Sequence, residues 1–228
     1  MSLKPKKHSD IQKLKEKMKI KASKMDTLNE LPPYTMIISE GTKTEPLYLK
    51  GFVNKINEKY KHISREPHIR VCGTARNTQG LIRFVDKMIA NGEWAHFKKI
   101  WLVYDKDDFP LDNFDNTQFE AEAREEPCMA VAWSNESIEL WFLLHFQEYH
   151  ANNGRKQYIE KLKEYIDYSK TREDLYDVLM AKGSLEDAKR RARKMYQEFI
   201  EAGESSAAAM VPATRVYELV EELEQYLR

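Results

Sequence analysis

The sequence predicts an α/β fold: a mostly parallel sheet of about four strands, flanked by helices and followed by a C-terminal helical cover. Two observations predict it. Between residues 31 and 150, short apolar runs alternate with segments of helical periodicity, the pattern of strand–helix–strand crossovers in a parallel sheet. After residue 150 only the helical periodicity continues, which indicates helices packed against that sheet.

Four apolar runs are interpreted as buried strands, at 34–39, 68–72, 99–105 and 128–134. The helices that follow them are expected at 45–60, 77–92, 116–126 and 136–150. Pro46 suits the first turn of the first helix, and Gly92 suits the end of the second.

The rest of the chain is expected to be helical and to pack on the core. The expected helices are at about 155–168, 171–182, 184–201 and 213–228, with a loop at 203–214. No linker-like stretch divides the α/β core, residues 31–150, from residues 151–228. The second part is therefore expected to be a helical cover rather than a separate domain.

Composition favours a globular protein with an uneven charge distribution. The formal net charge is +0, yet residues 1–25 hold nine lysines and two acids, while residues 105–139 hold eleven acids and two cations. Residues 1–30 are therefore expected to form a basic arm, partly disordered or helical, that meets a polyanion. The simpler explanation is a solvated tail beside an ordinary acidic surface.

Cysteine usage and hydropathy give an expected location. The chain has two cysteines and no apolar run of the ~18–20 residues that cross a bilayer. A reducing cytoplasm, without a membrane partner, is the expectation.

Two of the expected strands end in carboxylates. Glu40 follows the first strand, and Asp105, Asp107 and Asp108 follow the third. If the two strands are neighbours, these acids meet at one sheet edge, and hard cations such as Mg²⁺ or Mn²⁺ take carboxylate oxygens there. Taken singly, a residue such as Glu40 beside a glycine is more often a turn or helix-start residue, and the aspartates are explained equally well as a solvated acidic loop.

Two further segments extend this expected site. In "WSNESIELWFLLHF" (133–146), Glu139 opens toward the same edge, whereas helix capping is sufficient to explain Glu136. In "EGTKTE", Lys43 and Thr44 precede a helix N-terminus that can bind an anion, although the spacing is not that of a P-loop. His145 is a candidate substrate contact, but on an apolar helix it is more often a core histidine.

Four blocks of the sequence, in order, resemble the RloB-like family, which is related to Toprim domains. They are "ISEGTKTEPLYLKGF", "VYDKDD", "WSNESIELWFLLHF" and "VPATRVYELV". The resemblance implies a Toprim-like fold with Glu40 as the acid after the first strand and Asp105 with Asp107 as the D-x-D pair. It matches Glu139 and His145 to the family's third block, in which Ile138 replaces an aromatic residue and Glu136 stands where proline is frequent.

The resemblance also implies a setting, since RloB-like proteins are associated with restriction-modification loci and phage defence. The leading hypothesis is a Mg²⁺-dependent nucleic-acid phosphodiesterase with Glu40, Asp105, Asp107 and Glu139 as catalytic residues. The second hypothesis is a non-catalytic subunit that binds nucleic acid or nucleotide while a partner defence protein does the chemistry. A receiver-like phospho-acceptor domain ranks last, because that fold needs an acidic pair after its first strand.

Overall fold

The computed structural model of the protein describes residues 31–64, 66–106 and 111–228; the expected basic arm at 1–30 lies outside them. Residues 33–228 form one compact unit. The sheet has five strands in the order β2-β1-β3-β4-β5. They are β1 (Thr35–Ser39), β2 (Ile69–Gly73), β3 (Lys99–Asp105), β4 (Cys128–Asn135) and β5 (Ala213–Thr214).

Neighbouring strands among β1 to β4 are parallel, and β5 joins the edge antiparallel to β4. The predicted α/β class and mostly parallel sheet are therefore confirmed. All five residues of β1 are buried, as expected for a strand covered on both faces.

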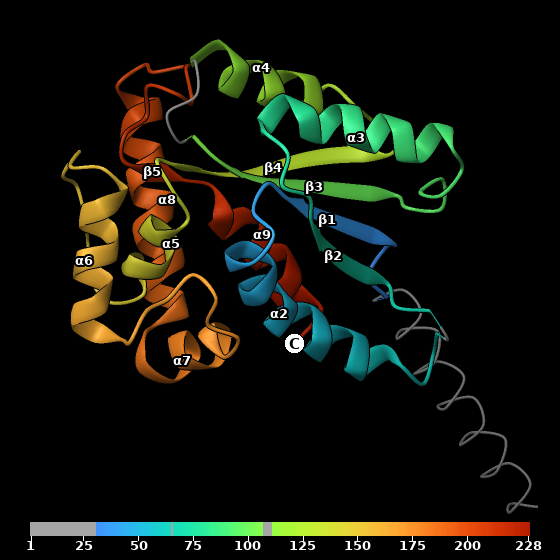
Figure 1. The fold of residues 1–228 in the computed structure, drawn as a ribbon, viewed down its shortest axis with the longest axis horizontal. Coiled ribbons are helices and arrows are strands. Elements are labelled where there is room, and N and C mark those ends of the chain that lie inside the picture. Colours follow the sequence, from blue (N-terminus) through green and yellow to red (C-terminus); the bar gives the residue numbers. More distant parts are fainter. Residues whose placement is uncertain (1–30, 65, 107–110) are drawn as a thin grey trace, which may run out of the picture. The chain divides into compact units, whose positions relative to one another are not determined.

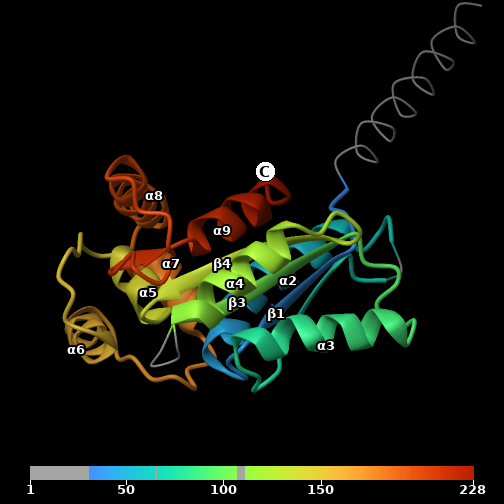
Figure 2. The same ribbon diagram turned by 90° about the horizontal axis from the view of Figure 1, so that it is seen from above.

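The helices lie in two layers on the sheet and a group beyond its end (Figure 1). Helices α3 (Thr78–Ala90) and α4 (Leu111–Glu122) cover one face, and α2 (Thr44–Tyr60) and α9 (Val216–Gln225) cover the other, as the view from above also shows (Figure 2). The remaining helices follow the carboxyl end of β4. They are α5 (Glu139–Leu144), α6 (Arg155–Tyr165), α7 (Leu175–Lys182) and α8 (Leu185–Glu201).

Buried aromatic residues fill both faces of the sheet. On one face Phe114 of α4 contacts Tyr104 and Trp133 edge-on. On the other face the Trp141 indole N–H donates to the Tyr48 hydroxyl at 2.9 Å. This bond joins α5 to α2. It therefore fixes the helices beyond the strand ends to the helix layer that α2 and α9 form on the sheet.

The helix expected at 136–150 is much shorter in the structure, where α5 spans only Glu139–Leu144. The reason is tertiary. The Leu144 carbonyl accepts a bond from the Arg191 guanidinium at 2.7 Å. The His145 carbonyl accepts the Ser184 N–H at 2.9 Å. Residues of α8 and its N-cap thus bind the carbonyls that a longer helix would have used.

Other boundaries also differ from expectation: α6 ends at Tyr165 rather than 168, and α7 begins at Leu175 rather than 171. Helix α4 begins at Leu111 rather than 116, and the expected helix at 213–228 is divided into β5 and α9. The hydroxyls of Ser134 and Thr214 lie 2.9 Å apart between the paired strands β4 and β5. A two-residue strand has no periodicity of its own, so the sequence gives no sign of it.

Candidate functional site

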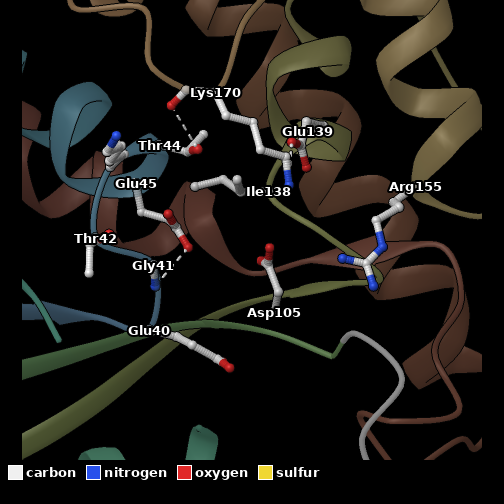
Figure 3. A pocket seen from close by; sticks show the side chains of 11 residues that line it. Glu40, Gly41, Thr42, Thr44, Glu45, Asp105, Ile138, Glu139, Arg155 and Lys170 are labelled. Carbon is white, nitrogen blue, oxygen red and sulfur yellow. Dashed lines mark hydrogen bonds and ion pairs between the residues drawn. The ribbon is translucent and has the colours of Figure 1, made fainter. Parts of the chain in front are cut away.

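A charged cavity of about 280 Å³ lies at the carboxyl ends of β1 and β3 (Figure 3). In open parallel sheets this edge is where ligands bind. Four acidic residues line the cavity, Glu40, Glu45, Asp105 and Glu139. Three cations line it as well, Lys43, Arg155 and Lys170.

Strands β1 and β3 are neighbours, so Glu40 and Asp105 both lie at this edge, as expected. Their carboxylates do not point the same way. The Glu40 N–H donates to the Val103 carbonyl at 2.9 Å, one residue beyond the pairing of Ser39 with Val103. Glu40 is therefore level with Tyr104 and one step out of phase with Asp105, and side chains on a strand alternate between faces.

Figure 3 shows the same difference. The Asp105 carboxylate points into the centre of the cavity, whereas the Glu40 carboxylate points away from it, below the strand ends. Glu45 and Glu139 line the same cavity as Asp105. A direct bridge of one ion between Glu40 and Asp105 would require one of the two side chains to turn.

Glu45 is a site residue that the sequence reasoning missed. It lies in the first turn of α2, is 6% exposed, and accepts the Gly41 N–H at 3.3 Å. Burial raises the pKa of this carboxyl, the hydrogen bonds from backbone N–H groups oppose the rise, and the charge of Glu139 adds to it. A signal was present, because Glu45 continues the buried stripe of Leu49, Phe52 and Ile56 at helical spacing.

Gly41 makes room for the Glu45 carboxylate. A Cβ at Gly41 would lie 2.2 Å from Glu45 Oε2, closer than a non-bonded carbon and oxygen can approach, so the packed carboxylate would have to move. The glycine after β1 is thus required by the packed carboxylate rather than by its own backbone angles.

Glu139 is 1% exposed and lies at the inner wall of the cavity. Its Oε1 accepts the Tyr168 hydroxyl at 2.8 Å and lies 3.7 Å from Lys170 Nζ. Burial raises the pKa of the Tyr168 hydroxyl, and the Glu139 charge raises it further. Glu136 lies outside the cavity lining and accepts the Arg155 N–H at 3.0 Å, a capping role at α6.

Four other candidates from the sequence have different places. Lys43 is exposed and lines the cavity. Thr44 is buried, and its hydroxyl donates to the Lys170 carbonyl at 3.1 Å. Asp107 and Asp108 lie outside the described residues.

His145 does not line the cavity. Its ring lies in the core against Trp141 and Tyr48, and neither ring nitrogen has a hydrogen-bond partner in the part of the chain that the structure describes. Burial lowers the pKa of His145 to about 3, and the nearby Arg191 charge acts in the same direction. The core interpretation of this histidine is therefore the one that the structure shows, and a substrate contact is not.

Arg155 and Lys170 are the other residues that the sequence reasoning missed. Both come from the helical part, from the start of α6 and from the segment before α7. Neither residue follows a strand, so the pattern of acids at strand ends does not indicate them. Both are far from Asp105 in the sequence, which therefore does not indicate that they line the same cavity.

The donors at the cavity have a defined chemistry. Carboxylate oxygens suit hard cations, and Mg²⁺ is usually held by one or two carboxylates together with water and phosphate oxygens. Within residues 31–64, 66–106 and 111–228, no group of three or more His, Cys, Asp or Glu is placed to hold a metal ion. A site of the sparser Mg²⁺ type fits this donor set, with Asp105 as its central described acid.

Comparison with known proteins gives one match. Residues 35–223 match the family described as RloB-like protein. No curated protein and no solved structure matches the chain. Among the described helices, none has the length and apolar character needed to cross a bilayer.

Proposed function

The chain belongs to the RloB-like protein family, and from this premise we propose that it is a Mg²⁺- or Mn²⁺-dependent nucleic-acid phosphodiesterase. One observation carries the proposal. Asp105 points into a cavity at the carboxyl ends of parallel strands, where carboxylates and cations line the same space. Carboxylates suit a divalent metal, and cations suit a phosphate group.

Asp105 is the described residue proposed to hold the metal, and Asp107 is the second acid of its D-x-D pair. Asp108 is a further donor from the same segment. Glu139 faces the cavity from α5 with one oxygen held by Tyr168, so it is suited to fix a metal-bound water rather than to change position. A bound metal would supply charge neutralisation at the scissile phosphate and lower the pKa of a water nucleophile.

Glu40 has two roles open to it in this reaction. It either holds the metal through water or accepts a proton from the attacking water. Its carboxylate points away from Asp105 (Figure 3), which favours a role that does not need direct shared coordination. Lys43, exposed at the rim, is placed to steady a phosphate oxygen, and Thr44 holds the Lys170 segment in position.

The biological setting of the proposal follows from the family resemblance. We propose action on DNA or RNA in the cytoplasm, as part of restriction-linked phage defence, with a partner defence protein. The lysine-rich residues 1–25 would add salt-dependent affinity for the phosphate backbone without reading sequence.

Cleavage of labelled single- and double-stranded DNA and RNA tests the proposal. Wild-type protein is compared with Asp105→Asn in Mg²⁺, Mn²⁺ and EDTA, and Asp177→Asn, an exposed acid of α7, is the control. We expect cleavage by wild type and by the control, and no cleavage in EDTA. Asp105→Asn is expected to reduce cleavage at least ~100-fold. Full activity of Asp105→Asn would exclude this site.

A non-catalytic subunit is the second candidate. Two observations favour this candidate. The carboxylates of Glu40 and Asp105 point in different directions, and the described residues contain no group of three possible metal ligands. Salt-dependent nucleic-acid binding by the wild type, without cleavage in any metal, would support this candidate over the first.

A further inference from the structure

Lys170 and Arg155 enter the candidate site from the helical part of the chain, opposite the strand ends (Figure 3). Lys170 extends along the cavity wall beside Glu139. Arg155 extends from α6 toward Asp105. The Asp105 carboxylate points into the same cavity, so these two cations line the space that a metal-bound group would occupy.

The backbone that carries Lys170 is fixed on both sides. The Thr44 hydroxyl binds the Lys170 carbonyl at 3.1 Å, and the Tyr168 hydroxyl binds Glu139 at 2.8 Å. Beyond Lys170, the Arg172 guanidinium binds the Asp174 carboxylate at 2.6 Å and also the Asp167 carbonyl. The side chain of Lys170 is therefore presented from a tethered segment rather than from a loose loop.

Glu139 does not fully engage the ammonium of Lys170. The two groups are 3.7 Å apart, whereas charge-assisted N–H···O bonds are ~2.7–2.9 Å. The Lys170 side chain is 57% exposed, whereas Glu139 is buried and also accepts the hydrogen bond from Tyr168. The exposed ammonium can therefore reach a second anion in the cavity while the Tyr168 bond still holds Glu139.

The N-terminus of α6 holds Arg155 in place. The Arg155 N–H donates to Glu136 Oε2 at 3.0 Å, and Gly154 before it has a φ of 79°. This turn sets the direction in which the guanidinium leaves the helix. A guanidinium is well suited to bind a phosphate group through two parallel N–H···O bonds.

We propose that Lys170 and Arg155 form a phosphate-binding subsite that accepts a phosphodiester of an unpaired, single-stranded nucleic acid. The inference rests on the proposed function, because it takes the acidic side of the cavity as the metal side. The sheet then supplies the metal ligands, and the helical part supplies the cations that bind the substrate phosphate. Neutralisation by these cations offsets the repulsion between the substrate phosphate and the carboxylates of Glu45, Asp105 and Glu139.

The size of the cavity favours the binding of a single strand over a duplex. At about 280 Å³ it is slightly below the ~300–1,000 Å³ of pockets that enclose drug-sized ligands, enough for on the order of one nucleotide. Asp105 is half-buried and its carboxylate points into the cavity, so a phosphate approaches it from within the cavity. A single strand bends into such a space, whereas a duplex is stiff over ~150 base pairs.

The test measures binding, not cleavage. A fluorescent single-stranded decamer and a duplex of the same sequence are titrated with full-length protein at several salt concentrations. Ca²⁺ replaces Mg²⁺, and a gel verifies that each probe stays intact. Lys170→Gln and Arg155→Gln are compared with Lys163→Gln and Arg83→Gln, which change exposed cations outside the cavity lining.

Each phosphate contact with a single strand contributes a slope of ~0.7 to the dependence of log K on log salt. We expect Lys170→Gln and Arg155→Gln each to reduce the slope by ~0.7, with Lys170→Arg close to wild type and both control variants unchanged. The duplex is expected to bind more weakly and to show no difference among the variants. Unchanged slopes in Lys170→Gln and Arg155→Gln, equal losses in the controls, or equal binding of the duplex would overturn the subsite.

The outcomes separate the two proposals. Cleavage by wild type with unchanged slopes overturns the subsite and leaves the phosphodiesterase standing. The expected slopes without cleavage in any metal support the subsite and overturn the phosphodiesterase. If neither probe binds, the subsite is overturned, and the cleavage assay decides the proposed function.

Discussion

The hydroxyl of Tyr168 donates a 2.8 Å hydrogen bond to the carboxylate of Glu139. The two residues lie on opposite sides of α6 in the sequence, and both are buried. The bond joins the segment before α7 to the first turn of α5. The bond holds the carboxylate of Glu139 at the cavity from a segment outside α5.

Removal of this bond is expected to affect both stability and the site. Tyr168→Phe removes a hydrogen bond to a charged group, a loss of ~1.5–3 kcal/mol in the free energy of unfolding. Urea unfolding measures it, and cleavage should decrease as Glu139 loses its fixed orientation. Tyr165→Phe is the control, because Tyr165 is exposed and bonds Gln147 at 3.0 Å. An equal effect of the two variants would contradict the prediction.

Glu45 is expected to reduce the stability of the protein at neutral pH. Burial raises the pKa of its carboxyl in the folded state. Between the unfolded and folded pKa values the folded state binds the extra proton, so stability is gained as pH falls and lost as pH rises. Glu45→Gln should therefore raise Tm at pH 7, by ~2–4 °C for each kcal/mol gained, and reduce cleavage.

Thermal unfolding at pH 7 and pH 5 checks this effect of Glu45. The difference in Tm between Glu45→Gln and wild type should be smaller at pH 5 than at pH 7, because the raised pKa of the folded wild-type carboxyl makes its stability increase as the pH falls. Glu201→Gln, at the exposed end of α8, should leave Tm unchanged at both values. A lower Tm for Glu45→Gln at pH 7 would show that the carboxylate stabilises the fold.

His145 is expected to make stability fall at acid pH. Its pKa of about 3 in the folded state is below the ordinary value of 6.5. Below pH 6.5 the unfolded chain binds a proton that the folded chain does not, so the free energy of unfolding decreases as pH falls toward 3. His145→Leu removes this contribution and should flatten the pH dependence between 4 and 6.5.

Urea titrations at several pH values measure the slope, and His62→Leu, at an exposed position, is the control. If His145→Leu keeps the wild-type slope while His62→Leu changes it, the buried neutral histidine is not the cause.

Gly51 is expected to be essential for the contact of α2 with α7. A Cβ at this position would lie 2.0 Å from a ring carbon of Tyr176. Alanine is a better helix former than glycine by ~1 kcal/mol, but overpacking costs ~1–3 kcal/mol or more. Gly51→Ala should thus lower the free energy of unfolding, whereas Lys50→Ala, at an exposed position of the same helix, should change it by under ~0.5 kcal/mol. Higher stability of Gly51→Ala would mean that α7 yields at this contact.

The parallel sheet and the helices around it were predictable because their signals are local. Buried strands such as 99–105 are apolar runs, and helices such as 45–60 repeat at 3.6 residues. The position of Asp105 at a strand end was predictable for the same reason, whereas the pairing of its strand with the strand that precedes Glu40 was not. The length of α5 and the strand β5 were not, since bonds from Arg191, Ser184 and Thr214 set them.

The sequence by itself determined the α/β class, the strand ends that carry acids, and the family. Only the tertiary structure decided which side chains share the cavity. It turned Glu40 away from Asp105 through the pairing register, and it brought in Glu45, Arg155 and Lys170. The physical reason is that periodicity reports the environment of each segment, whereas the direction of a side chain at a strand end depends on register and on helices packed from far along the chain.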